Sequence, residues 1–363
     1  MPGWESVDRL MRNAIERGVF PGAVLRVLVR DRVAFEQAYG WADLFSTRAM
    51  TADTLFDLAS LTKPLAAAVA VMALIRDGRI DLDTPCGALL PESVGTGKAK
   101  ITLRQLLCHR SGLPAWRPFF LRLQSETATA RCTELKRLVL SQPLEAPPGT
   151  RSEYSDLGFM LVQWLLERIC GESLDRYVTR RVYRPLGIAD LFFNAVSAQP
   201  AALQRFAATQ LCPWRHRLLV GAVDDDNAWI MGGVAGHAGL FGTAAAVGRL
   251  VGAMVAADQD AVGRGPFSTE LVRTFFDHDP QERWALAFDR PSVEGSSAGR
   301  YFPADSVGHL GFTGTSFWVH RSRRIVVILL TNRVHPYRYR AGIKVFRPRL
   351  HDAVMEALGA AQE

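Results

Sequence analysis

The segment Ser60-Leu61-Thr62-Lys63-Pro64, followed by the apolar run Leu65–Ile75, is the most informative stretch of the sequence. The apolar run predicts a buried helix over Leu65–Asp77, because it is too short for a membrane span and is bounded by charged residues. Pro64 is tolerated in the first turn, where its missing N–H has no intrahelical partner. Ser60 therefore lies at the start of a helix, and Lys63 shares its face.

This arrangement could activate the serine as a nucleophile. A serine hydroxyl needs a base to take its proton, and a lysine can serve if desolvation or a neighbouring cation lowers its pKa from about 10.4. Ser60 and Lys63 form the only Ser-x-x-Lys of the chain, and only five of its 43 basic residues are lysines. An N-cap serine beside a solvated lysine is the alternative that these residues alone leave open.

Two later motifs complete a recognisable order. Tyr154-Ser155-Asp156 comes next, and His309-Leu310-Gly311 precedes a predicted C-terminal strand. The order Ser-x-x-Lys, Tyr-x-Asn, Lys/His-x-Gly resembles serine β-lactamases, D,D-peptidases and their esterase relatives, with class C β-lactamases and family VIII esterases the most similar. The resemblance covers nearly the whole chain, including Phe20–Ala23, Gly40, Asp57–Ala59, Leu106–Pro114, Pro148-Gly149, Pro185–Gly187, Gly232–Phe241 and Leu330–Arg333.

The resemblance implies a role for each motif residue. Ser60 would be the acylated nucleophile, Lys63 its base, and Tyr154 would share the proton transfer. The N–H groups of Ser60 and Phe312 would form the oxyanion hole. The substrate-binding residues would be Asp156, His309, Gly311 and Phe312. We expect neither a metal nor an organic cofactor.

Two departures from the pattern bear on the substrate. Asp156 stands where Asn is usual, and a carboxylate cannot donate a hydrogen bond to a substrate carbonyl. Beside Lys63 it would favour the ammonium form and shift the base role toward Tyr154. His309 and Leu310 replace a Lys-Thr pair, so a permanent cation and a hydroxyl are missing where penicillin-type enzymes hold the substrate carboxylate. Both changes favour an ester or a neutral amide over a β-lactam.

The periodicity of the termini predicts an α+β fold. A helix over Glu5–Arg17 precedes a hairpin of Ala23–Val29 and Arg32–Tyr39. A second hairpin, Ser316–His320 with Ile325–Thr331, precedes a helix from Gly342 toward Leu358. Further helices are expected at Leu103–Cys108, Leu157–Ile169 and Ala244–Ala256. We therefore expect one catalytic domain over 1–363: an antiparallel sheet with flanking helices, from about 1–60 and 283–363, and an all-helical lobe over about 61–282.

Composition adds limits but names no partner. The chain has a net charge of +7, and His320–Leu350 carries nine Lys or Arg and no acid. We interpret this basic run as a solvated face, not a nucleic-acid site. Five scattered cysteines without a CxxC predict reduced, mostly buried thiols. The first residues lack a signal pattern, so we expect a cytoplasmic protein that acts on a small molecule without nucleic acid or membrane. The oligomeric state is not predicted.

Other motifs have ordinary explanations. Gly295-Ser296-Ser297-Ala298-Gly299 matches a G-x-S-x-G elbow, but no strand–helix context surrounds it, so Ser297 is expected in a loop. Asp224–Asn227 lacks the Gly and distal Glu of a calcium loop and indicates a turn or helix cap. We expect a polar loop at Asp277-His278-Asp279, close backbone packing at Gly232–Gly242 with a structural His237, and no catalytic role for His109.

These observations rank the possible functions. A serine hydrolase acting through an acyl-Ser60 intermediate comes first, as a carboxylesterase on small acyl esters. A D-amino-acid peptidase or amidase follows, and then a β-lactamase. A non-catalytic binding protein on the same scaffold is the alternative of another class. Retention of Ser60, Lys63 and Tyr154 argues against it, since a binder needs none of them.

Overall fold

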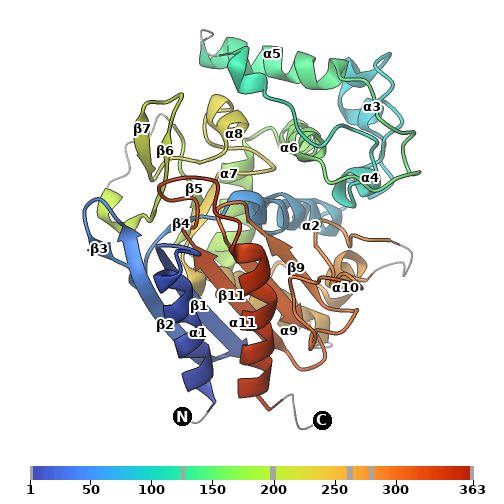
Figure 1. The fold of residues 1–363 in the computed structure, drawn as a ribbon. Coiled ribbons are helices and arrows are strands. Elements are labelled where there is room, and N and C mark those ends of the chain that lie inside the picture. The colour runs from blue at the N-terminus through green and yellow to red at the C-terminus, as the bar shows by residue number, and fades with distance from the viewer. Residues whose placement is uncertain (1–2, 124–126, 197–201, 260–264, 278–281, 360–363) are drawn as a thin grey trace.

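A six-stranded antiparallel sheet, with strand order β3-β2-β1-β11-β10-β9, occupies the lower half of the molecule in Figure 1. The computed structural model describes residues 3–123, 127–196, 202–259, 265–277 and 282–359. The strands of this sheet are β1 (Gly22–Val29), β2 (Arg32–Asp43), β3 (Arg48–Ala49), β9 (Val307–Leu310), β10 (Ser316–His320) and β11 (Ile325–Thr331). Both predicted hairpins are therefore confirmed. They form one sheet because β11 of the second hairpin pairs with β1 of the first.

The two ends of the chain meet at the centre of the sheet. β1 pairs with β11 in a continuous register from Ala23 opposite Thr331 to Val29 opposite Ile325. Alternate side chains of these strands enter different cores, since strand residues point to opposite faces in turn. Leu25 and Leu329 pack with the terminal helices α1 (Trp4–Glu16) and α11 (Ile343–Ala357), which cover one face. The other face packs against the helices of the middle of the chain.

The remaining helices surround the segment that carries Ser60. They are α2 (Val69–Arg76), α3 (Cys86–Leu89), α4 (Leu103–Leu107), α5 (Ala128–Ser141), α6 (Asp156–Cys170), α7 (Leu174–Val178), α8 (Asp226–Ile230), α9 (Ala244–Gln259) and α10 (Thr269–Phe276). The helix after Ser60 begins as a π-helix over Lys63–Ala68 and continues as α2. Its residues through Leu74 are buried, as predicted. The stretch Ala59–Arg76 is long and apolar enough to span a membrane, but a buried core helix passes that test equally.

The expectation of an all-helical lobe over 61–282 is wrong in two respects. This part also contains four short strands: β5 (Leu191–Phe193), β6 (Ala208–Cys212), β7 (Arg217–Val220) and β8 (Leu240–Gly242). In addition, α9 packs directly against the sheet, where Gly248 lies close to Leu28 and Ile328. A long apolar helix can cover a sheet as readily as it can join a bundle, and periodicity does not distinguish the two.

β8 links the nucleophile segment to the rest of the fold. It pairs with β4 (Phe56–Asp57), which immediately precedes the Ser60 turn. The Leu240 N–H donates to Thr62 Oγ1 (3.1 Å), and the Leu58 N–H donates to the Leu240 carbonyl (2.9 Å). The predicted close packing of this glycine-rich segment is confirmed, because a Cβ on Gly236 would lie 2.2 Å from the Phe159 carbonyl oxygen.

Candidate active site

Ser60 lies in a turn whose backbone is held from several directions. The preceding residue, Ala59, has φ of 48°, a left-handed conformation that costs free energy for a residue with a Cβ. The Ala59 N–H donates to Asp57 Oδ1 (2.9 Å), and the other oxygen of that carboxyl accepts from the Asp224 N–H (2.6 Å). Asp57 therefore fixes the turn that presents Ser60. Burial, together with nearby Asp224, raises the pKa of Asp57 to about 7.

The turn between β9 and β10 packs directly against the Ser60 turn. Thr313 Oγ1 donates to the Asp57 carbonyl (2.7 Å), and Thr315 Oγ1 donates to the Leu58 carbonyl (3.0 Å). A Cβ on Gly311 would lie 2.7 Å from the Leu58 oxygen and 2.0 Å from Thr315 Oγ1, so only glycine fits there. The Phe312 N–H makes no hydrogen bond within the described residues. The close packing of the two turns is compatible with the oxyanion hole that we predict from the Ser60 and Phe312 N–H groups.

Lys63 is fully buried and lies within hydrogen-bond reach of the nucleophile. Its Nζ is 3.1 Å from Ser60 Oγ, 3.1 Å from the His237 carbonyl oxygen and 2.7 Å from Asp156 Oδ1. It also lies 4.8 Å from the centre of the Tyr154 ring. Burial lowers the pKa of Lys63, but the attraction of Asp156 and Tyr154 exceeds it and leaves the pKa raised. Lys63 is thus an ammonium ion in the resting site.

Tyr154 completes the group around the nucleophile. Burial raises the pKa of its phenol; Lys63 opposes this shift, and Asp156 adds to it. The resting site therefore holds a phenol, an ammonium and a carboxylate. Because the three groups are in contact, protons leave the set as a unit and not from one residue. The electrostatic coupling expected from Asp156 beside Lys63 has the required geometry.

His309, on β9, is neutral. Burial and the charge of Lys63 lower its pKa to about 3. Its Nδ1 lies 2.9 Å from the Leu310 carbonyl oxygen, so Nδ1 carries the proton and Nε2 is an acceptor. Nε2 is buried and has no hydrogen-bond partner among the described residues. The position that holds a lysine in penicillin-type enzymes therefore holds no charge here.

Sequence reasoning missed the residues that support Tyr154. The His109 ring lies 4.5 Å from the Tyr154 ring and 4.9 Å from Trp284, and its Nδ1 accepts from the Ser155 N–H (3.0 Å). Burial, with Lys63 and His309 nearby, holds the pKa of His109 well below its ordinary value. His109 thus positions the tyrosine as a neutral ring. The motif around His109 resembled the family pattern, but nothing local indicated contact with a residue 45 positions away.

The predictions for the other motifs have mixed outcomes. Asp225 caps α8 by accepting from the Ala228 N–H (2.7 Å), as predicted, but it also lies 3.1 Å from His237 Nε2 in the wall of the site. Ser297 lies in a loop outside the site, where its carbonyl accepts from His351 Nδ1 (2.7 Å). All five cysteines are free thiols. His278 and Asp279 lie outside the described residues.

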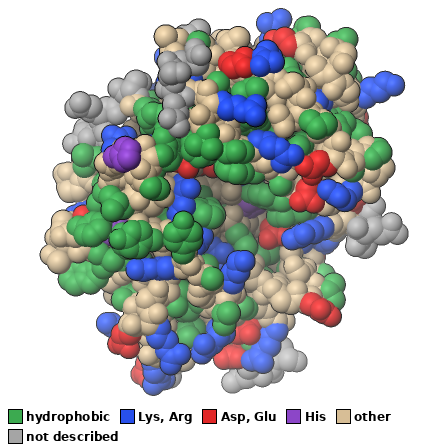
Figure 2. All heavy atoms as spheres, turned by 45° about the horizontal axis from the view of Figure 1, so that its top comes forward, with side chains coloured by type: hydrophobic (Ala, Val, Ile, Leu, Met, Phe, Trp, Pro, Cys, Tyr) green, Lys and Arg blue, Asp and Glu red, His purple; other side chains and the backbone are tan. Residues whose placement is uncertain are grey.

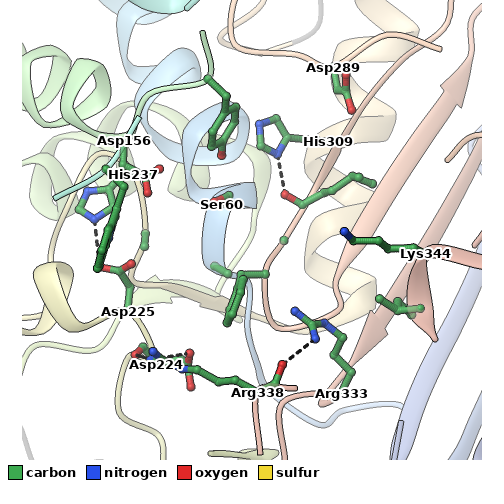
Figure 3. A pocket seen from close by; sticks show the side chains of 18 of the residues that line it. Ser60, Asp156, Asp224, Asp225, His237, Asp289, His309, Arg333, Arg338 and Lys344 are labelled. Atoms are coloured by element: carbon green, nitrogen blue, oxygen red, sulfur yellow. Dashed lines mark hydrogen bonds and ion pairs between the residues drawn. The ribbon is translucent and has the colours of Figure 1, made fainter. Parts of the chain in front are cut away.

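A cleft of about 730 Å³ opens over these groups. Figure 3 shows Ser60 at its centre, with Asp156, His237 and Asp225 on one side and His309 and Lys344 on the other. Five residues of the C-terminal basic run also line it: Arg333, Arg338, Arg340, Lys344 and Arg347. The expectation that this run is a solvated face holds for the exposed Lys344 but is wrong for Arg347, which is buried. The loop that follows β11 and the start of α11 turn them toward the nucleophile, which a linear charge pattern cannot show.

Comparison with known proteins places this site in a family. The family model described as Beta-lactamase matches residues 7–347. The chain belongs to the beta-lactamase family. Its relatives include a "Putative D-alanyl-D-alanine carboxypeptidase" from Salmonella enteritidis PT4 (strain P125109), 28% identical over 91% of this chain and 82% of that protein. They also include an N-acetylmuramyl-L-alanine amidase from Bacillus subtilis (strain 168), 29% identical over 91% of this chain and 80% of that protein.

A solved structure gives the same fold for this member of the beta-lactamase family. EstCE1, a hydrolase with promiscuous acyltransferase activity, superposes with a TM-score of 0.76 at 20% identity, covering 96% of this chain and 97% of that one. The family and its relatives indicate a serine hydrolase of the beta-lactamase and penicillin-binding-protein type. The predicted family and fold class are thus confirmed, while the roles of individual site residues stay predictions.

The contact between Lys63 and Asp156 predicts a shift in the pH profile. Activity requires the loss of a proton from the Lys63–Tyr154 pair, and Asp156 raises both pKa values. The pH at which activity rises should therefore be lower in Asp156→Asn than in the wild type. Tyr154→Phe should reduce kcat by the roughly 10²–10⁴-fold expected for losing a general base. A pH–rate series on the wild type and both variants measures this. An unshifted profile in a normally folded Asp156→Asn variant would exclude the coupling. Lys63 would then be the leading candidate for the general base.

The hydrogen bonds of Asp57 predict a positioning role. Asp57→Asn replaces one acceptor oxygen with an NH₂ group that faces a backbone N–H, so the Ser60 turn should shift. We expect kcat to fall by about ten- to a hundredfold, the scale of a misplacement near 1 Å, with a smaller change in KM. Asp53→Asn, which changes an exposed carboxyl four residues earlier, serves as control. Equal kcat values for the two variants would contradict the role of Asp57.

Proposed function

We propose that this protein hydrolyses carboxylic esters through an acyl-Ser60 intermediate, with small acyl esters as the preferred class. The observation that carries the proposal is the contact of Ser60 Oγ with the buried Lys63 ammonium, beside Tyr154, on the floor of the cleft. The reaction requires no group beyond the side chains and backbone N–H groups described above.

The proposed reaction has two steps. In the first, the Lys63–Tyr154 pair has lost one proton to solvent, and Ser60 Oγ attacks the carbonyl carbon while its own proton passes to the coupled set of Tyr154, Lys63 and Asp156. Collapse of the tetrahedral intermediate breaks the bond to the leaving group, which takes up that proton. In the second step, water attacks the acyl-serine and gives a proton to the same set; the bond from the acyl carbon to Ser60 Oγ then breaks, Oγ takes that proton back from the set, and the acid is released. The N–H groups of Ser60 and Phe312 would stabilise the oxyanion in both steps.

The preference for esters over β-lactams rests on His309. A neutral imidazole with a free acceptor, next to Leu310, offers neither the cation nor the hydroxyl that would hold a β-lactam carboxylate beside the third motif. An ester also has a better leaving group than an amide, because an alcohol oxygen leaves more readily than an amine nitrogen. This suits a site in which one coupled set serves as both base and acid.

An amidase or peptidase is the second candidate. The Bacillus subtilis relative is named as an amidase and the Salmonella relative as a carboxypeptidase, and both align over 91% of this chain. Both reactions proceed on an acyl carbon, so the acyl-Ser60 step would be shared. The alternatives differ only in the leaving group.

The role of Ser60 can be tested by labelling. Ser60→Ala should abolish hydrolysis of p-nitrophenyl butyrate and the mass shift produced by a fluorophosphonate probe in intact-mass spectrometry. Ser297→Ala should leave both unchanged, since Ser297 lies outside the cleft. Loss of activity in Ser297→Ala with retention in Ser60→Ala would show that the nucleophile is assigned wrongly.

The substrate class can be tested by comparing rates. Short acyl esters should turn over with kcat/KM at least about a hundredfold above that of nitrocefin, a gap of roughly 2.7 kcal/mol in transition-state stabilisation. Steady-state kinetics with both substrates on one preparation gives the ratio. Comparable values would remove the argument that the uncharged third motif decides specificity.

A further inference from the structure

The buried ammonium of Lys63 has three N–H groups, and three acceptors lie within their reach. Nζ is 3.1 Å from Ser60 Oγ, 2.7 Å from Asp156 Oδ1 and 3.1 Å from the His237 carbonyl oxygen. Ser60 and Asp156 belong to the catalytic motifs, whereas the third acceptor is a backbone oxygen of a loop. The position of Nζ relative to Ser60 therefore depends on how that loop is held.

The loop that carries the His237 carbonyl has few means of holding itself. Between Gly232 and Gly242, His237 is the only residue with a polar side chain, and five of the other ten residues are glycines, whose backbone is the least restricted. One side of the loop is bound to α6, where Gln163 Oε1 accepts from the Gly236 N–H (2.9 Å). On the other side, the His237 ring is the polar group that can fix it.

Asp225 fixes that ring. Asp225 Oδ1 lies 3.1 Å from His237 Nε2, and the same oxygen accepts from the Ala228 N–H (2.7 Å) at the start of α8. Burial opposes ionisation, but His237, the Ala228 N–H and Lys63 together lower the pKa of Asp225 to about 2. Asp225 is thus a carboxylate, which can only accept, so Nε2 carries a proton. Figure 3 shows the pair on the same side of Ser60 as Asp156.

The His237 ring has no second polar contact that would orient it. Its side chain is 1% exposed, and its Nδ1 is buried without a hydrogen-bond partner among the described residues. Asp225 itself lines the cleft, which is the hollow that Lys and Arg side chains surround in Figure 2. The orientation of a buried ring beside Lys63 is therefore set by a carboxylate on the cleft wall.

We propose that Asp225 is a positioning residue for the acyl-Ser60 reaction. It fixes the His237 ring and, with it, the His237 carbonyl that holds Lys63 Nζ beside Ser60 Oγ. This inference rests on the proposed function and adds to it a residue that acts through Lys63. The carbonyl and the negative charge of Asp225 both favour the ammonium form, so releasing them should misplace Nζ and lower the pKa of Lys63.

A pH profile can report this effect because the other groups around Lys63 are accounted for. His109 and His309 are neutral, as described above. The remaining titratable groups that face Lys63 are Tyr154, Asp156, Asp225 and His237. A shift in a variant that leaves Tyr154 and Asp156 intact therefore reports on the Asp225–His237 pair.

Two substitutions of Asp225 separate its hydrogen bonds from its charge. Asp225→Ser keeps an oxygen that caps α8 but is too short to reach the His237 ring. We expect kcat to fall by about ten- to a hundredfold, KM to change by less than about twofold, and activity to rise at a lower pH than in the wild type. Asp225→Asn keeps an oxygen that can accept from both N–H groups and should recover most of kcat, with a pH profile still displaced because the charge is lost.

The measurement is a pH–rate series with p-nitrophenyl butyrate, with each rate divided by the amount of Ser60 that the fluorophosphonate probe labels at completion. His237→Ala should reproduce the loss seen in Asp225→Ser. The double variant Asp225→Ser/His237→Ala should be no worse than either single variant, because the two residues act as one unit. Ser268→Ala removes the cap of α10, a hydrogen bond from the Leu271 N–H (3.2 Å) outside the cleft, and should change none of these values.

The outcomes separate this inference from the proposed function. Additive losses in the double variant, or a loss expressed in KM, would show that Asp225 contacts the substrate directly and would overturn the positioning role. Wild-type kcat and pH profile in Asp225→Ser would overturn it as well, while the acyl-Ser60 chemistry would stand. If Asp225→Ser does not fold, His237→Ala decides, since it leaves the cap of α8 intact. If the wild type neither hydrolyses the ester nor takes the label, the proposed function fails and this inference fails with it.

Discussion

The buried ammonium of Lys63 is the constraint on which the site depends. A charge with no solvent exposure costs several kcal/mol unless counter-charges and hydrogen-bond acceptors surround it. Here the carboxylate of Asp156 and the carbonyl of His237 do so, and they come from the start of α6 and from the loop before β8. Three segments far apart in sequence must therefore converge at one point. Their convergence brings Tyr154 against the lysine and closes one wall of the cleft.

A second set of contacts joins this group to the sheet. The hydroxyls of Thr313 and Thr315 bind the backbone just before Ser60, and Arg347 of α11 donates to the Thr315 carbonyl (2.8 Å). The nucleophile thus lies between the helical part of the chain and the sheet formed by its two ends. The left-handed Ala59 is tolerated because these bonds, with those of Asp57, determine the local backbone.

The sequence predicted local secondary structure but not the contacts between residues far apart in the chain. Runs rich in β-branched and aromatic residues predicted β10 and β11 at their observed bounds, and the Ser-x-x-Lys motif located the nucleophile helix. Short elements such as β9, with Gly308 in its middle, carry too little pattern to be recognised. The contacts of Asp57 with the Asp224 N–H and of His109 with Ser155 span 167 and 46 residues. Such pairs leave no periodic signal, so their residues were assigned to turns and loops or given no role.

The charge of Lys63 also acts on the third motif. It contributes to lowering the pKa of His309 to about 3, so a second cation at the third motif would meet the same repulsion in the same buried space. Asp156, where Asn is usual, stabilises the ammonium, and its own negative charge 2.7 Å away offsets part of the effect of that ammonium on more distant groups. The neutral state of His309 thus follows first from its burial and second from the buried ammonium.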